Sequence, residues 1–112
     1  MTIFEKIATR EIPAKIIHET DELVAFHDAH PQAPVHVLVV PKKHIVRIGE
    51  AGELDVELLG RLLIGARDAA RLTGIADSGY RVVINNGRDA GESVPHLHLH
   101  VLGGRALTWP PG

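Results

Sequence analysis

The sequence predicts an α+β domain, in which an antiparallel five-stranded sheet carries one long helix on a face and one short helix at the N-terminus. Two observations support this fold class. Five short apolar or alternating stretches are separated by proline, glycine and polar residues, a pattern typical of strands joined by turns. One longer stretch instead repeats apolar residues at intervals of three and four, which is the period of a helix. At 112 residues, the chain has the length of a single domain, residues 1–112.

The first expected element is a short helix over about residues 3–9. Thr2 followed by Glu5 is the pattern of a capping box, in which each side chain bonds a backbone amide at the helix start. Pro13 cannot continue a helix, so the element ends before it. Its apolar residues recur at helical spacing and are Ile3, Phe4, Ile7 and Ala8.

The sheet is expected from five apolar stretches. The polar turn Thr20-Asp21-Glu22 joins the first two into a hairpin. The third follows a loop with two prolines and is interrupted only by His36, so it is expected to be a buried central strand. A polar, glycine-bearing loop over residues 85–92 separates the last two. The expected strands are residues 15–19, 23–27, 35–40, 80–84 and 96–102.

The long helix is expected between the third and fourth strands. At about 20 residues it would be roughly 30 Å long, enough to cover one face of a small sheet. Gly74 stands where the glycine that ends a helix belongs. A single apolar face is expected from Leu54, Leu58, Leu59, Leu62, Leu63, Ala66, Ala69 and Ala70.

Composition excludes several classes of protein. The chain has no cysteine, so it can form neither a disulfide nor a thiolate metal site. Its formal net charge of −2 gives no basic footprint for nucleic acid. No apolar run reaches the roughly 18 residues of a membrane span, and the first residues do not resemble a signal peptide. We therefore expect a cytoplasmic domain that binds neither nucleic acid nor a membrane.

The most informative stretch is residues 96–102, where histidine alternates with apolar residues. Side chains on a strand alternate between its two faces, so Leu97, Leu99 and Val101 should face a core. The three histidines should share the opposite face, with neighbours roughly 6.5–7 Å apart at Cα. Imidazoles titrate near neutral pH, so such a row suits the handling of protons, metals or phosphate. The three are His96, His98 and His100.

Residue chemistry alone leaves three interpretations open. The histidines could bind zinc, with His36 or Asp28 completing the ligand set. One imidazole could instead attack phosphorus while its neighbours bind the phosphoryl oxygens. Alternatively, the row has no chemical role. His18 and His44 stand beside charged or loop residues and are expected on the solvated surface.

The loop before the histidine row offers neutral hydrogen-bond donors. An amide, a hydroxyl and accessible backbone N–H groups can hold an anion without a net positive charge. The same residue types also form ordinary turns. The donors are Asn85, Gly87, Gly91 and Ser93.

The stretch His96-Leu97-His98-Leu99-His100-Val101-Leu102 matches the pattern of the histidine triad family. The resemblance covers nearly the whole chain and is strongest to the Hint branch, the histidine triad nucleotide-binding proteins. Beyond the triad it is carried by Thr2-Ile3-Phe4, Glu11-Ile12-Pro13-Ala14-Lys15-Ile16-Ile17, Pro31-Gln32-Ala33-Pro34, Val40-Pro41-Lys42-Lys43-His44-Ile45, Ser93-Val94, Gly103-Gly104-Arg105 and Trp109-Pro110-Pro111-Gly112.

The resemblance implies a role for each matching residue. His98 would be the nucleophile that carries the nucleotide, His96 and His100 would hold phosphate oxygens, and His36 would join the proton relay. Asp28 would bind the ribose hydroxyls. The phosphate or the leaving nitrogen would be contacted by Asn85, Ser93 and the loop around Gly91. The purine would lie against Ile3, Phe4, Ile7, Phe26, His27 and Leu38.

The resemblance also implies a homodimer whose sheets join, with the strand 81–85 and the long helix forming most of the interface. Trp109 would reach toward the partner's site. The chain departs from the pattern at His30, Pro95 and Thr108, which puts specificity rather than reaction type in question.

The function so implied is that of a purine nucleoside phosphoramidase, with a nucleotide of the AMP or GMP type as its ligand. It would need no metal and no other cofactor. The alternatives are a dinucleoside polyphosphate hydrolase, a zinc enzyme, and a nucleotide-binding interaction module whose catalysis is incidental. The tail Trp109-Pro110-Pro111-Gly112 argues against the first of these.

Overall fold

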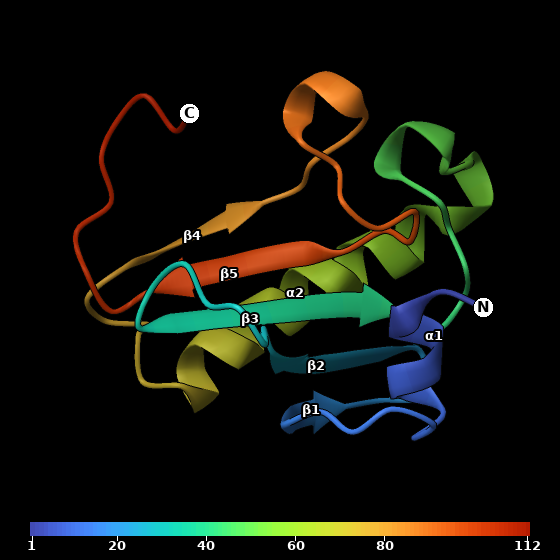
Figure 1. The fold of residues 1–112 in the computed structure, drawn as a ribbon, viewed down its shortest axis with the longest axis horizontal. Coiled ribbons are helices and arrows are strands. Elements are labelled where there is room, and N and C mark those ends of the chain that lie inside the picture. The colour runs from blue at the N-terminus through green and yellow to red at the C-terminus, as the bar shows by residue number, and fades with distance from the viewer.

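The computed structural model describes residues 1–112 and confirms the predicted fold class. Five antiparallel strands form one sheet in the order β1-β2-β3-β5-β4. The long helix α2 covers one face, and the short helix α1 lies on the other face at one end (Figure 1). The elements are α1 (Ile3–Ala8), β1 (Ile16–Glu19), β2 (Leu23–His27), β3 (Val35–Pro41), α2 (Val56–Leu72), β4 (Tyr80–Val83) and β5 (Leu99–Gly103). Three short 3-10 turns accompany them: η1 (Ile48–Glu50), η2 (Glu53–Asp55) and η3 (Arg88–Ala90).

Helix α1 begins with the predicted capping box. The Glu5 amide donates to Thr2 Oγ1 at 3.2 Å, and the Thr2 amide donates to Glu5 Oε1 at 2.9 Å. Phe4 and Ile7 are buried against the sheet. The capping box therefore sets where the helix starts, and its two buried residues set which side faces the sheet.

Helix α2 confirms the predicted position but corrects its apolar face. Leu62 and Ala66 are buried against the sheet, whereas Leu54 is 98% exposed and Leu63 is 53% exposed. Leu54 lies in η2, before the helix begins, so it does not follow the helical period. Leu63 follows Leu62 directly and therefore points about 100° away from it around the axis. No helix of the structure is both long and apolar enough to cross a membrane.

The two faces of the sheet carry two separate clusters. Toward α2 lie Val37, Val39, Leu99 and Val101, with the buried residues of that helix. Toward α1 lie Val24, Phe26, Leu38 and Val40, with Phe4 and Ile7. His100 pairs with Leu38 in the β3–β5 register, so it lies on the α1 face. The sheet therefore places the histidine side chains opposite the long helix.

Strand β5 begins at Leu99, not at His96 as the alternating pattern predicted. The register that pairs Leu99 with Val39 would place Leu97 opposite Pro41. Proline has no N–H to donate to a ladder. The Leu97 amide bonds the Ile45 carbonyl instead, at 2.7 Å. The first two histidines of the row therefore stand just outside the strand, where they gain contacts with other segments.

Candidate active site

His98 is held in a tautomer that leaves one ring nitrogen free. Its Nδ1 lies 2.7 Å from the His96 carbonyl oxygen, and since that oxygen only accepts, Nδ1 carries the hydrogen. The Nε2 atom therefore keeps a lone pair. The ring is 5% exposed and stands edge-on to the Phe4 ring at 5.0 Å. A fixed, unprotonated Nε2 is what an imidazole nucleophile requires.

His100 and His36 form a hydrogen-bonded pair next to His98. The Gln32 amide donates to His36 Nδ1 at 3.0 Å, so His36 carries its hydrogen on Nε2. That nitrogen lies 2.9 Å from His100 Nδ1, which therefore accepts, and His100 keeps a hydrogen on Nε2. The Asp28 carboxylate lies 3.4 Å from the same His36 nitrogen. The pair thus presents one N–H of His100 as a donor.

Burial keeps these histidines neutral. It lowers the pKa of His100 to about 4, with smaller contributions from His98 and His36. Burial also lowers the pKa of His36, and the nearby Asp28 carboxylate opposes that shift. Both residues are therefore unprotonated on one nitrogen near neutral pH, as the hydrogen-bond geometry requires.

His96 has partners other than the phosphate oxygen implied by the family resemblance. Its Nε2 donates to the Pro41 carbonyl at 2.8 Å, and its Nδ1 accepts from the Thr2 hydroxyl at 2.9 Å. The side chain is 1% exposed, and burial lowers its pKa. Both ring nitrogens are thus engaged. In this structure His96 ties the start of α1 to the end of β3 and, through its carbonyl, orients His98.

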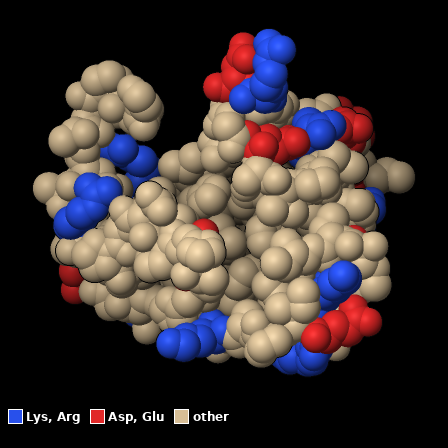
Figure 2. All heavy atoms as spheres, viewed as in Figure 1, with Lys and Arg blue, Asp and Glu red and all other residues tan.

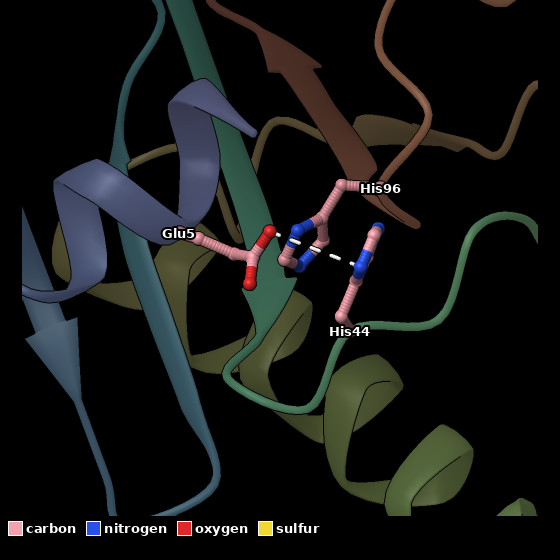
Figure 3. Close-up of side chains that lie close together, drawn as sticks. All are labelled: Glu5, His44 and His96. Carbon is pink, nitrogen blue, oxygen red and sulfur yellow. Dashed lines mark ion pairs between the residues drawn. The ribbon is translucent and has the colours of Figure 1, made fainter. Parts of the chain in front are cut away.

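His44 contacts His96, although the sequence suggested only a solvated surface residue. The two rings stack at 5.1 Å, and His44 Nε2 donates to the Pro95 carbonyl at 2.9 Å. Its Nδ1 lies 3.8 Å from Glu5 Oε1 (Figure 3). The contacts join residues 39, 51 and 52 positions apart, so no local pattern reveals them. The side chain remains 41% exposed.

Two groups of side chains could hold a metal ion, because three ligand atoms in each lie within 4.8 Å of one another. In both groups hydrogen bonds already engage part of the donor set. The Thr2 hydroxyl bonds His96 Nδ1, and His36 bonds His100. The groups are Glu5 with His44 and His96, and Asp28 with His36 and His100.

The residues assigned to a purine cleft divide between the two faces of the sheet. Phe4, Ile7, Phe26 and Leu38 belong to one cluster, with the Phe4 and Phe26 rings 5.7 Å apart. His27 pairs with Val37, on the α2 side, because it alternates with Phe26 along β2. Alternation within the strand already indicated this separation.

The sheet face that carries α1 has few charged side chains at its centre. Its Lys and Arg side chains gather at the rim, and the middle of the face is mostly uncharged (Figure 2). Ile3 is 48% exposed beside the buried Phe4. The apolar cluster therefore has an accessible edge that carries little fixed charge.

The remaining predicted residues lie in the connection between β4 and β5. Ser93 and Gly91 are exposed and Asn85 is half-buried, all at the loop that carries η3. Ser93 also lines an open pocket of about 490 Å³ with Glu5 and His44.

Trp109 is 81% exposed and lies on the C-terminal tail. Arg81 holds that tail, donating to the Thr108 carbonyl at 2.9 Å and lying 6.0 Å from the Trp109 ring centre. The tail is thus anchored beside β4, with the indole free.

Solved structures resemble this one over nearly their whole length. A HIT family hydrolase from Legionella pneumophila is 47% identical with a TM-score of 0.96, and each chain is covered completely. A histidine triad nucleotide-binding protein from Candida albicans is 30% identical with a TM-score of 0.83, covering 98% of this chain and 83% of that one. Fold and clustered imidazoles together define a small α+β protein with the fold of HIT family hydrolases.

The sequence comparisons agree with the structural ones. A HIT-like protein of Synechocystis sp. is 54% identical over 111 residues, which is 99% of this chain and 96% of that protein. The HIT domain model matches residues 9–107. The chain belongs to the HIT family.

Proposed function

We propose that the protein is a purine nucleoside phosphoramidase, which hydrolyses the P–N bond of nucleoside 5'-phosphoramidates and also accepts acyl-adenylates. The observation that carries this proposal is the tautomer of His98. Its Nδ1–H is held by the His96 carbonyl, and its Nε2 keeps a lone pair beside the hydrogen-bonded pair of His36 and His100. An attack on phosphorus needs such a nucleophile and a donor for the charge that develops on oxygen.

The reaction would proceed in two displacements at phosphorus. His98 Nε2 attacks, a P–N bond to the imidazole forms, and the P–N bond to the amine breaks. The amine nitrogen takes up a proton as it leaves, and we assign the passage of this proton from solvent to the relay of His36 and His100. Water then attacks phosphorus and gives up a proton through the same relay, the bond to His98 breaks, and nucleoside monophosphate is released.

The surrounding residues would bind the nucleotide. The His100 Nε2–H donates to a phosphate oxygen, and Asp28 accepts from the ribose hydroxyls. Asn85, Gly91 and Ser93 supply neutral donors at the phosphate and the leaving nitrogen. The purine lies against the cluster of Phe4, Ile7, Phe26 and Leu38, with Ile3 at its edge. We assign His96 to holding α1 and His98 in place.

The comparisons with known proteins support a hydrolase that acts on a nucleotide. The Legionella relative is described as a hydrolase and the Candida relative as nucleotide-binding. The phosphoramidate substrate rests on the residue pattern and the site geometry.

The test is release of AMP from adenosine 5'-phosphoramidate in the presence of EDTA. We expect full turnover, because imidazoles and loop donors provide the stabilisation that a metal would otherwise supply. Activity that disappears with EDTA and returns with zinc would contradict the proposal and make the two three-residue groups metal ligands. Tight AMP binding without turnover, in either condition, would favour an interaction module.

We also propose a homodimer formed through β4 and α2. Strand β4 is at the edge of the sheet, so one side of its backbone is unpaired. Exposed apolar side chains accompany it on the strand and on the helix. They are Val56, Leu63, Ile64, Leu72, Tyr80, Val82 and Ile84.

Replacing Val82 by arginine is expected to shift the dimer to monomer, since it would bury a charge in the interface. Sedimentation equilibrium measures the change. Leu54→Arg is the matched control, because Leu54 is 98% exposed and lies in η2, outside the proposed interface. A Val82→Arg protein that still sediments as a dimer would show that this edge is not the interface.

A further inference from the structure

An ion pair holds the loop that carries the proposed phosphate donors. Arg47 Nε lies 2.8 Å from Glu92 Oε1, and Arg47 Nη2 lies 3.0 Å from Glu92 Oε2, a two-pronged arrangement that fixes both side chains. The Glu92 side chain is 12% exposed and that of Arg47 33% exposed. Glu92 immediately precedes Ser93, so the pair holds the chain next to one of the proposed phosphate donors.

Glu92 also closes its own loop. The Gly87 amide donates to Glu92 Oε1 at 3.1 Å, and the Glu92 amide donates to the Gly87 carbonyl at 3.1 Å. Between them, Arg88, Asp89, Ala90 and Gly91 are exposed. The loop therefore has no apolar anchor between its ends, and its position depends on these polar contacts.

The same loop is joined to the segment around η1 at a second point. The Gly49 amide donates to Asn86 Oδ1 at 2.7 Å. Arg47 also pairs with Glu50 within that segment. In Figure 1 the two segments stand next to each other beyond the end of the sheet. Arg47 thus links a loop to a turn 45 residues away along the chain.

We propose that Arg47 and Glu92 are positioning residues, which hold the loop of Gly91 and Ser93 in register with His98 and neutralise a carboxylate that would otherwise repel the anionic substrate. This inference rests on the proposed function. Neutral donors stabilise a developing charge only if they are already oriented, and a misplacement of about 1 Å can cost 10²-fold in rate. The hydrogen bonds from Arg47 hold the pKa of Glu92 below its usual range, so the carboxylate is charged.

The inference predicts that substituting Arg47 and substituting Glu92 lower kcat/KM by different amounts. Arg47→Met leaves the Glu92 carboxylate uncompensated beside the phosphate, so KM should rise and kcat should fall, lowering kcat/KM by about 10–10²-fold. Glu92→Gln removes the negative charge but keeps an oxygen to accept from Gly87, so its loss should be smaller. Adding Glu92→Gln to Arg47→Met should therefore recover several-fold in kcat/KM.

The measurement is a double-mutant cycle on AMP release from adenosine 5'-phosphoramidate, with kcat and KM determined separately. Arg61→Met is the matched control, because Arg61 is an exposed arginine paired with Glu57 and Glu22 on another part of the surface. Its kcat/KM should stay within about twofold of the wild type. The thermal midpoint of each variant reports any general loss of stability.

The outcomes distinguish the positioning role of Arg47 and Glu92 from the proposed phosphoramidase activity on which it rests. A double variant that recovers activity but not thermal stability would support a positioning role, because a merely structural pair would lose both together. If Arg47→Met has the same kcat/KM as the wild type, or if the double variant has no higher kcat/KM than Arg47→Met, the inference is overturned and the proposed function stands. A wild type that releases no AMP would overturn both.

Discussion

Replacing His98 by alanine is expected to reduce AMP release by at least about 10³-fold, because it removes the only atom that we assign to the attack on phosphorus. Neighbouring histidines cannot replace it. Both nitrogens of His96 are engaged with Thr2 and Pro41, and the Nδ1 of His100 accepts from His36. The measurement is single-turnover release of AMP, with samples quenched in alkali, where the P–N bond survives, and examined for a nucleotidyl-histidine adduct that is expected on the wild type only.

The control must separate lost chemistry from lost folding. His18→Ala removes a half-buried histidine on β1, away from the site, and should keep wild-type turnover. His98→Ala should retain AMP binding within about tenfold, because the base cluster and the loop donors remain. Persistent turnover in His98→Ala, or an adduct still formed there, would show that a different residue is the nucleophile.

The second large effect expected is loss of stability in mild acid. His36, His96 and His100 all have a lowered pKa in the folded protein, each chiefly because of burial, and that of His100 is about 4. In the unfolded chain a histidine titrates near 6.5, so between those values the unfolded state binds more protons. The free energy of unfolding should therefore fall as the pH drops from about 6.5 toward 4, and should change little above 6.5 from this cause.

The contribution of His100 alone reaches about 3 kcal/mol at its upper limit, since each unit of pKa difference corresponds to about 1.4 kcal/mol. Urea unfolding at a series of pH values measures it. His100→Asn should flatten the dependence between pH 6.5 and 4 relative to the wild type. A wild-type stability that is constant over this range would contradict the burial of neutral histidines.

Both expected results depend on the same feature of the site, its buried and hydrogen-bonded histidines. The site buries His36, His96 and His100, which lowers the pKa of each, and it gives ring nitrogens partners with a defined role: a carbonyl oxygen for His96 and an amide for His36. The His96 carbonyl oxygen likewise accepts from His98 Nδ1. Those partners select the tautomers. The arrangement that makes His98 a nucleophile therefore also makes folding sensitive to acid.

Local sequence patterns predicted most of the elements. The capping box placed α1, short apolar runs bounded by polar or proline-containing turns placed β2 and β3, and the helical period placed α2. Such patterns report contacts between residues a few positions apart, so they are visible in one chain read by itself. The same reasoning placed three histidines together, and the resemblance to the histidine triad family implied that His98 is the nucleophile.

Contacts between distant segments were decided by tertiary structure. The Pro41 position opposite Leu97 ended β5 early and freed His96 to bond Thr2, 94 residues away. His44 stacks on His96 and Arg47 pairs with Glu92 because the segments following β3 and preceding β5 meet at one end of the sheet. The sequence by itself thus determined the fold class, most elements and the candidate chemistry. Contacts between distant segments, which no local pattern encodes, decided which partners His96 has and what holds the loop.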